Sequence, residues 1–324
     1  MSKKILISAP YMIPVLDRFR AVFEHYGLDL VVPNVEERME AEDLLEYAGD
    51  IDGAITGDDR FNDNVLKAFA PRLKVISKWG TGIDSIDQAA AQKLGVDIRN
   101  TPGAFTNPVA DSVLAYILAF ARQTPWLDKS LKSGGWAKVP GRALRECTLG
   151  VIGVGEIGKS VLQRAKAFDM HLIGNDIVEI DSDFIAATDL EMTSLEELLG
   201  QSDFVSLNCS LNPSSHHILN AERIRLMKSS AVIINTARGS LIEEQALIEA
   251  LKDDRLAGAG LDVFEDEPLP KNSPLRTMEQ VLLAPHNANS SPEAWEAVHW
   301  NTIRNLLSGL DIEHNDLDPK DYPA

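Results

Sequence analysis

The chain has little cysteine, no long apolar run and no excess of positive charge. Its 324 residues include only two cysteines, Cys147 and Cys209, which argues against a disulfide framework and a cysteine-rich zinc site. No stretch approaches the ~20 apolar residues of a membrane-spanning helix, and the N-terminal apolar run is too short for a secretory signal peptide. The formal net charge of −18 disfavours nucleic acid and anionic membranes as partners. We therefore expect a cytoplasmic protein without a metal site.

What the chain does have is a regular alternation of short apolar runs and longer amphipathic segments. In the first hundred residues the expected strands are 4–8, 28–32, 53–56, 73–77 and 96–99, with helical patterns such as 15–26 and 41–47 between them. This alternation predicts a parallel sheet covered by helices.

A glycine-rich turn follows the apolar run that begins at residue 149. Gly153, Gly155 and Gly158 have the spacing G-x-G-x-x-G, and Asp176 comes 18 residues after Gly158. The first glycine permits a tight turn, the second lets the backbone approach a pyrophosphate, and the third allows close packing of helix on strand. The helix N-terminus adds free N–H groups for phosphates. The pattern predicts a dinucleotide site.

Asp176 indicates which dinucleotide is bound. A carboxylate accepts hydrogen bonds from the ribose hydroxyls of NAD but repels the 2′-phosphate of NADP. No arginine follows in the next three residues, Ile177-Val178-Glu179. We predict NAD.

After residue 148 the alternation continues with six expected strands, at 149–154, 171–175, 204–208, 231–235, 258–263 and 281–284. Six strands with intervening helices complete a doubly wound fold, in which ligands bind beyond the carboxyl ends of the strands. The last three strand ends carry Arg238, the acids Glu265-Asp266-Glu267, and His286. Arginine suits a substrate carboxylate and histidine suits proton transfer. Singly, each has an ordinary alternative as a surface or turn residue, but their joint placement favours an active site.

Two helices flank this second half. Asn107, as N-cap, and Pro108 are expected to open one, and Ser291-Pro292 the other. We infer a crossover between two domains, in which 102–290 binds the nucleotide and 1–101 with 291–324 forms the substrate domain.

Taken together, these motifs resemble those of the NAD-dependent D-isomer-specific 2-hydroxyacid dehydrogenase family, in its phosphoglycerate dehydrogenase-like branch. The resemblance rests on Gly80-Thr81-Gly82-Ile83-Asp84, the glycine turn, Asn235-Thr236-Ala237-Arg238-Gly239, Leu261-Asp262-Val263-Phe264 and Pro285-His286. It implies a Rossmann NAD-binding domain inserted into a flavodoxin-like substrate domain, a D-2-hydroxy acid or 2-oxo acid as the partner, and a homodimer built largely through the helix near Asn107.

The resemblance also implies a role for each matching residue. Arg238 would bind the substrate carboxylate, His286 would exchange the proton, and Glu267 would pair with His286, which leaves Glu265 and Asp266 as bystanders. The implied cofactor contacts are Gly153, Gly155, Glu156, Ile157, Gly158, Asp176, Cys209, Thr236, Ala237, Asp262, His286 and Ala288. The implied substrate contacts are Lys78, Gly80, Thr81, Gly82 and Arg238.

The chain departs from the family pattern at several positions. Glu156 stands where Arg or Lys is usual, and an acid beside the pyrophosphate weakens NAD binding. Thr56-Gly57 replaces the Arg-Ser that helps to hold a phosphate in the phosphoglycerate branch, with Arg60 and Lys78 as nearby cations. Asn287-Ala288-Asn289 follows His286. Phosphoglycerate and glyoxylate or hydroxypyruvate both remain candidate substrates.

Two other interpretations bear on the outcome. A non-catalytic NAD(H)-sensing protein of the corepressor type would keep the same Arg, Glu and His. A long unstructured C-terminal extension or a peptide-binding N-terminal segment would favour it, neither is evident in this sequence, and turnover would decide. The adjacent His216 and His217 are expected to diverge if they lie in a helix or strand, so we treat them as background.

Overall fold

The computed structural model describes residues 2–322. It divides into two compact units, which we describe separately. The first takes the chain up to Phe105 and again from Ser291, and the second is Thr106–Ser290. Among the described residues, no helix combines the length and apolar character needed to cross a membrane.

The first unit is built on a five-stranded parallel sheet with the order β2-β1-β3-β4-β5. This is the flavodoxin-like order. Its strands are β1 (Lys3–Ile7), β2 (Leu28–Val31), β3 (Gly53–Thr56), β4 (Val75–Lys78) and β5 (Asp97–Arg99).

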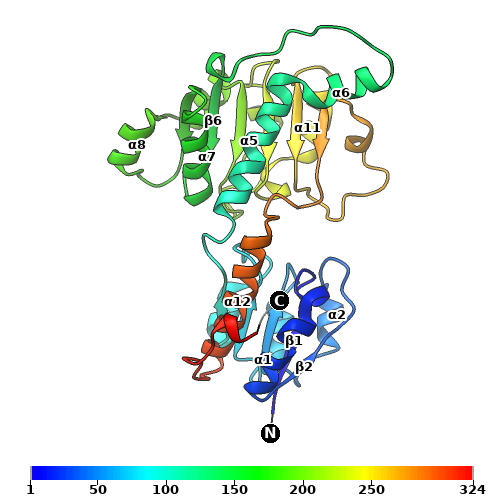
Figure 1. Cartoon of the computed structure of the whole chain (residues 1–324), viewed down its shortest axis with the longest axis vertical. Helices are drawn as coiled ribbons and strands as arrows, with labels where there is room; N and C mark the ends of the chain where they lie inside the picture. Colours follow the sequence, from blue (N-terminus) through cyan, green and yellow to red (C-terminus); the bar gives the residue numbers. More distant parts are fainter. Residues whose placement is uncertain (1, 323–324) are drawn as a thin grey trace. The chain divides into compact units, whose positions relative to one another are not determined.

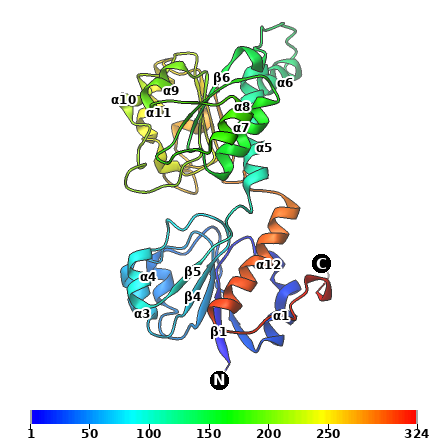
Figure 2. The ribbon, with the colours of Figure 1, turned by 90° about the vertical axis from the view of Figure 1, so that its left-hand side faces the viewer.

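Helices cover both faces of this sheet (Figure 2), with α1 and α12 on one face and α3 and α4 on the other. The helical segments are η1 (Ile13–Phe19), α1 (Arg20–His25), α2 (Ala41–Leu45), α3 (Asp63–Phe69), α4 (Gln88–Leu94), α12 (Pro292–Gly309) and η5 (Pro319–Asp321). The helix expected at 15–26 is thus a 3₁₀ segment followed by a short α-helix.

The second unit holds a seven-stranded parallel sheet with the order β12-β11-β10-β9-β6-β7-β8. Its strands are β6 (Thr148–Ile152), β7 (His171–Asn175), β8 (Glu191–Met192), β9 (Phe204–Leu207), β10 (Val232–Asn235), β11 (Gly258–Leu261) and β12 (Val281–Leu283). The strand order reverses between β6 and β9, and such a switch point is where doubly wound sheets bind ligands. The expectation of six strands was wrong by one, because β8 has only two residues and too short a pattern to detect.

Helices α5 and α7 lie on one face of the larger sheet and α9, α10 and α11 on the other (Figures 1 and 2). The helical segments are α5 (Thr106–Arg122), α6 (Thr124–Lys132), η2 (Leu144–Glu146), α7 (Glu156–Lys166), α8 (Ser182–Thr188), α9 (Leu195–Gln201), α10 (Ala221–Ile224), η3 (Gly239–Leu241), α11 (Glu244–Lys252) and η4 (Pro274–Thr277). The fold class, two doubly wound parallel-sheet domains, is confirmed.

One helix start differs from the expectation. Helix α5 begins at Thr106, so Asn107 lies inside its first turn and is not the N-cap. The Asn107 side chain instead accepts a hydrogen bond from Arg164 on α7. The start of α12 is as expected, since the Ser291 side chain accepts from the N–H of Ala294.

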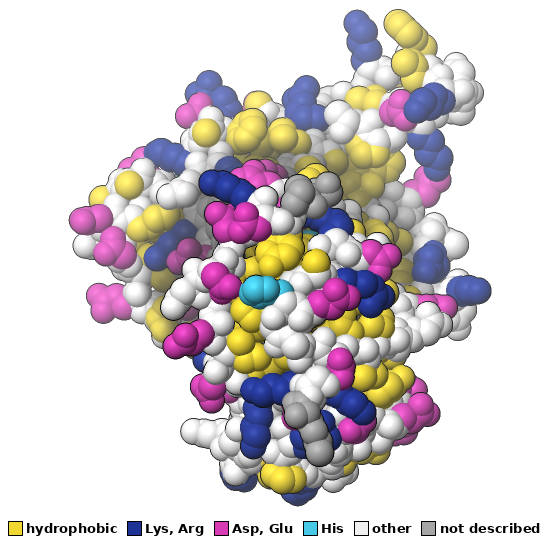
Figure 3. Space-filling view, turned by 60° about the horizontal axis from the view of Figure 1, so that its bottom comes forward, with side chains coloured by type: hydrophobic (Ala, Val, Ile, Leu, Met, Phe, Trp, Pro, Cys, Tyr) yellow, Lys and Arg dark blue, Asp and Glu magenta, His cyan; other side chains and the backbone are white. Residues whose placement is uncertain are grey.

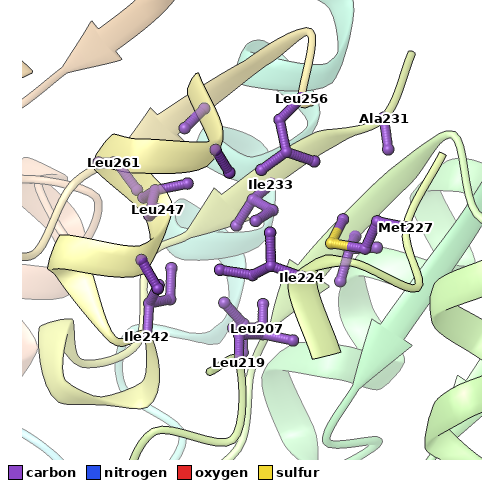
Figure 4. Close-up of a cluster of buried hydrophobic side chains, with 14 of the residues drawn as sticks. Leu207, Leu219, Ile224, Met227, Ala231, Ile233, Ile242, Leu247, Leu256 and Leu261 are labelled. Atoms are coloured by element: carbon purple, nitrogen blue, oxygen red, sulfur yellow. The ribbon is translucent and has the colours of Figure 1, made fainter. Parts of the chain in front are cut away.

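One of the apolar clusters of the second unit packs beneath α9, α10 and α11, and Figure 4 shows part of it. Ile233 of β10 is fully buried there, together with Leu207, Leu219 and Leu261. This close-packed apolar layer fixes the positions of the strands. It therefore also fixes the points at which the loops begin at the strand ends.

In the first unit, a buried hydrogen bond anchors the loop that follows β4. Trp79 donates through Nε1 to Nδ1 of His299 on α12 at 3.0 Å. Burial lowers the pKa of His299 to about 4, so the ring is neutral at pH 7 and can accept this bond. The turn Gly80-Thr81-Gly82 starts from this fixed point.

Acidic and basic side chains are interspersed over the surface shown in Figure 3. The negative net charge is therefore not gathered into one acidic patch on that face.

Candidate active site

The turn between β6 and α7 gives the three glycines three different surroundings. Gly153 has a φ of +91°, and a Cβ there would meet the backbone N of Cys209 at 2.5 Å. A Cβ on Gly158 would meet the carbonyl oxygen of Gly153 at 2.0 Å, so α7 packs directly on the turn. A Cβ on Gly155 would have nothing within 4 Å. The spacing thus produces a tight turn, an open position and a close contact, which is the arrangement that a dinucleotide needs.

Asp176 is fixed beside this turn. Its Oδ2 accepts a hydrogen bond from the N–H of Val154 at 2.6 Å, and Oδ1 accepts from the N–H of Val178 at 3.1 Å. On the other side of the turn lies Cys209, where burial and then the charge of Asp176 raise the pKa of the thiol to about 11. The thiol of Cys209 is therefore protonated near neutral pH and does not act as a nucleophile.

Arg238 leaves the carboxyl end of β10 on a loop held by Asn235. The Asn235 side chain donates to the carbonyl oxygen of Arg238 at 2.8 Å and accepts from the N–H of Ala237 at 3.1 Å. Arg238 itself donates from Nη1 to the carbonyl oxygen of Ala237 at 2.8 Å. Thr236, just before it, is buried, and its hydroxyl oxygen has no hydrogen-bond partner among the described residues.

Asp262 organises the next two strand ends. Its carboxylate accepts from the N–H groups of Asn287 and Ala288, both at 2.8 Å, and its carbonyl oxygen accepts from the N–H of His286 at 2.7 Å. Burial raises the pKa of Asp262, while the two N–H bonds act in the opposite direction. These bonds hold His286 with a φ of +50°, a left-handed conformation that is rare outside glycine.

Glu267 and His286 are in direct contact. His286 Nδ1 lies 3.0 Å from Glu267 Oε2, and the two side chains are 21% and 17% exposed. The other carboxylate oxygen, Oε1, accepts from the N–H of Phe264 at 3.0 Å. Glu267 is thus held from its own loop and is aimed at the imidazole.

Gly239 brings the Arg238 loop against the Glu267 loop. A Cβ at Gly239 would lie 1.9 Å from the carbonyl carbon and oxygen of Phe264 and 2.4 Å from the N of Glu265. The two backbones therefore touch, and no side chain fits between them. The sequence contained this glycine, but its role appears only once the two loops are seen together.

The residues of the second unit fit a bound NAD. Gly155 leaves open space at the start of α7, and the turn, Asp176 and Thr236 all lie at the carboxyl edge of one sheet. The Thr236 hydroxyl and Oδ1 of Asn208 are buried polar atoms without a partner in the part of the chain that the structure describes. Sequence reasoning missed Asn208. Its place directly after β9, at the switch point, was the available signal.

Known proteins give the decisive comparison. The family model for the NAD-binding domain of D-isomer-specific 2-hydroxyacid dehydrogenases matches residues 114–288. A glyoxylate reductase from Korarchaeum cryptofilum is 36% identical over 88% of this chain and 87% of its own length. The chain belongs to the D-isomer-specific 2-hydroxyacid dehydrogenase family.

Other members of the family resemble the chain to different extents. A D-3-phosphoglycerate dehydrogenase from Methanocaldococcus jannaschii is 42% identical over 79% of this chain, but over only 49% of its own length. A D-lactate dehydrogenase from Aquifex aeolicus, solved with NAD and lactic acid, has a TM-score of 0.84 and 26% identity, covering 95% of this chain and 96% of its own. This dehydrogenase is thus an NAD-binding oxidoreductase of 2-hydroxy and 2-oxo acids.

Four of the five candidate substrate residues, Lys78, Gly80, Thr81 and Gly82, lie in the first unit, whereas Arg238 lies in the second. The turn Gly80-Thr81-Gly82 is held by Thr101, which donates its N–H to Gly80 O at 2.9 Å and accepts from the Thr81 hydroxyl at 3.1 Å. Lys78 is buried, and its Nζ lies 3.0 Å from Oδ1 of Asp58. The charge of Lys78 is thus already compensated within this unit.

Glu156 and Ile157 open α7 as expected, and Glu156 is exposed in its first turn. A carboxylate at this position interacts favourably with the positive end of the helix dipole, but it would repel the pyrophosphate of a dinucleotide. We predict that Glu156→Gln tightens NADH binding by about 2–5-fold at low ionic strength, and that the gain disappears near 0.5 M salt. The measurement is a fluorescence titration of NADH at two salt concentrations.

The matched control for Glu156 is Glu222→Gln, another exposed acid in the first turn of a helix, α10. Its NADH affinity should equal that of the wild type. Unchanged affinity in Glu156→Gln at low salt would show that residue 156 does not face the pyrophosphate.

Proposed function

We propose that Arg238, Glu267 and His286 carry out the interconversion of a D-2-hydroxy acid and its 2-oxo acid with NAD(H) in this protein. The observation that carries the proposal is the contact of His286 Nδ1 with Glu267 Oε2 at 3.0 Å. It pairs a proton-exchanging group with a carboxylate that orients it, and both follow strands of the NAD-binding sheet.

The contact with Glu267 supports a different role for each imidazole nitrogen. When Nδ1–H donates to the carboxylate, Nε2 is the nitrogen that exchanges a proton with the substrate. In oxidation Nε2 accepts the proton of the substrate hydroxyl, and in reduction the protonated ring returns it to the forming alkoxide. Bound NAD(H) supplies the hydride acceptor or donor. Glu267 stabilises the imidazolium that exists between these steps.

Arg238 is the group that binds the acid. A guanidinium presents paired N–H donors that match a carboxylate, and its charge stabilises oxygen that becomes negative during reduction. The Asn235 bridge and the contact at Gly239 fix the Arg238 backbone. Little reorganisation is then needed when the substrate binds.

We also assign the substrate carboxylate to the turn Gly80-Thr81-Gly82. Within residues 2–322, the backbone N–H groups of these three residues donate to no protein acceptor. Consecutive unpaired N–H groups form a small anion-binding concavity, which supports the role implied by the resemblance.

Glyoxylate or hydroxypyruvate fits the chain better than a phosphorylated acid does. Lys78, one of the two cations nominated for a phosphate, forms an ion pair with Asp58. The hydroxyl of Thr56, where the phosphoglycerate branch has arginine, donates to Asp59. These partners reduce the positive charge available for a phosphate, so we propose small unphosphorylated 2-oxo acids as substrates.

The proposal predicts rapid reduction of glyoxylate or hydroxypyruvate with NADH, and slower reduction with NADPH because of Asp176. His286→Ala should lower kcat by about 10²–10⁴-fold, with the Kd of NADH within twofold of the wild type. Glu267→Gln should lower kcat less, because the imidazole remains. The measurements are steady-state kinetics and an NADH titration.

The control is His171→Ala, which removes an exposed histidine at the start of β7 and should leave turnover unchanged. A wild-type protein that binds NADH but reduces no 2-oxo acid would support the NAD(H)-sensing alternative. Full turnover in His286→Ala would contradict the assignment of the proton-exchanging group.

We further propose that the protein is a homodimer in the cytoplasm. Its two cysteines are free thiols, which supports a reducing compartment. The segment 129–145 has five basic residues and no acid, although the chain as a whole carries −18. It also exposes Trp136 (83%), Leu131 (56%) and Val139 (45%). Exposed apolar side chains at this density indicate an interaction surface.

A hollow of about 650 Å³ lies in the same unit, near the amino ends of β9 and β10. Its lining includes Phe120, Trp126 and Asp254, and also Arg142 of the segment itself and Glu279, which is paired with Lys129. The two aromatic rings and the carboxylate of Asp254 suit the exposed tryptophan and the basic groups of the same segment in a second copy of the chain. This surface continues from the end of α5, the helix implied in dimer formation.

The dimer proposal predicts that light scattering gives the mass of two chains, and that Trp136→Asp gives the mass of one. Burying a new charge in an interface is costly, whereas Leu226→Asp, at an exposed leucine of the same unit, should remain dimeric. A concentration of 50 µM is on the order of a thousandfold above the dissociation constant of a tight dimer. A wild-type protein that is monomeric at this concentration would contradict the proposal.

A further inference from the structure

The adjacent His216 and His217 lie in neither a helix nor a strand, so the condition under which they were expected to diverge is not met. Their rings stack with centroids 3.9 Å apart and an interplanar angle of 29°. His217 has a φ of +50°. Residues other than glycine rarely adopt this left-handed conformation, and they keep it where the surrounding structure holds them in it.

The backbone around His217 is bound to the loop that follows Arg238. The N–H of His217 donates to the carbonyl oxygen of Ser240 at 2.8 Å, and the N–H of Leu219 donates to that of Leu241 at 3.0 Å. Leu219 and Ile242 both enter the core beside these bonds (Figure 4). The main chain of His217 is therefore bound to Ser240, which lies two residues after Arg238.

The side chain of His217 is bound to the loop that carries Glu267. Its Nε2 lies 2.6 Å from Oε1 of Glu265, and each side chain is about one-third exposed. Glu265 stands two residues before Glu267. One residue thus contacts both loops, with its backbone on the Arg238 side and its imidazole on the Glu267 side.

Without the imidazole, Glu265 would face mainly other acids. Glu265 donates its N–H to Oε2 of Glu244 at 3.2 Å. Burial, and then the charges of Glu265 and Asp266, raise the pKa of Glu244. The histidine is the partner that holds the Glu265 side chain against this repulsion.

We propose that His217 is a positioning residue for the active site and that Glu265 is its partner. The pair adds a side-chain contact to the backbone contact that Gly239 makes between the Arg238 loop and the Glu267 loop, and through Glu267 it steadies the orientation of His286. Glu265 is therefore not a bystander. This inference rests on the proposed function, because the two loops matter only if they carry catalysis.

The test compares His217→Ala and His217→Gln with His216→Ala, a matched control that removes the stacked neighbour but no bond to Glu265. His217→Ala should lower kcat/KM for the 2-oxo acid by about 10–100-fold, since small misplacement of reacting groups is costly. The effect should fall mainly on kcat, with the NADH Kd unchanged. His217→Gln, whose amide reaches Glu265, should recover most of the activity.

Two further measurements separate positioning from misfolding. Glu265→Ala breaks the same bond without touching the left-handed backbone at residue 217, and should show a similar loss of kcat. In the double variant His217→Ala/Glu265→Ala, the losses should be clearly less than additive. Each variant is checked by thermal unfolding.

The outcomes distinguish this inference from the proposed function. A wild-type protein that reduces no 2-oxo acid would overturn both. Wild-type turnover combined with an equally active His217→Ala, or with additive losses in the double variant, would overturn the positioning role alone.

Discussion

The hydrogen bonds between the Asp262 carboxylate and the backbone of Asn287 and Ala288 are the interaction on which the site depends. The Asp262 side chain is buried, and so is its bond to Ala288, so breaking these bonds would leave a buried carboxylate without partners, at a cost of roughly 1–3 kcal/mol or more. Their effect is to close the loop after β12 onto the end of β11 and to hold His286 in a left-handed conformation. In that conformation the imidazole contacts Glu267. Asp262, a residue expected to hold the cofactor, thus also positions the pair that we propose exchanges the proton.

The parallel sheet supplies the remaining constraint. Because all strands of the second unit run the same way, their carboxyl ends lie at one edge, and every reactive group enters from that edge. Glycine then permits contacts that no other residue would allow: Gly158 lets α7 approach the turn, and Gly239 lets the Arg238 loop touch the Glu267 loop. The chemistry is carried by a few side chains, but their spacing is set by backbone contacts.

The sequence predicted the fold class, and it nominated Arg238, Glu267 and His286 as candidate site residues, because both inferences depend on strong local patterns. The glycine spacing, the six longer strand runs and the polar groups after them are all readable without coordinates. The two-residue strand β8 was not, since it holds no full period of alternation. Asn107 looked like an N-cap, but the helix begins one residue earlier. The contact of His217 with Glu265 spans 48 residues of sequence and depends on a left-handed backbone, so no local pattern announces it.

The central claim is that the strand-end groups of the NAD-binding sheet direct hydride transfer between nicotinamide and C2 of the acid. Its most direct test is the reduction of glyoxylate or hydroxypyruvate with NADH that carries deuterium at both C4 positions of the nicotinamide, followed by mass spectrometry and chiral analysis of the product. The account predicts deuterium on C2 and, for hydroxypyruvate, only the D-hydroxy acid. A product without deuterium, or one with the L configuration, would contradict it.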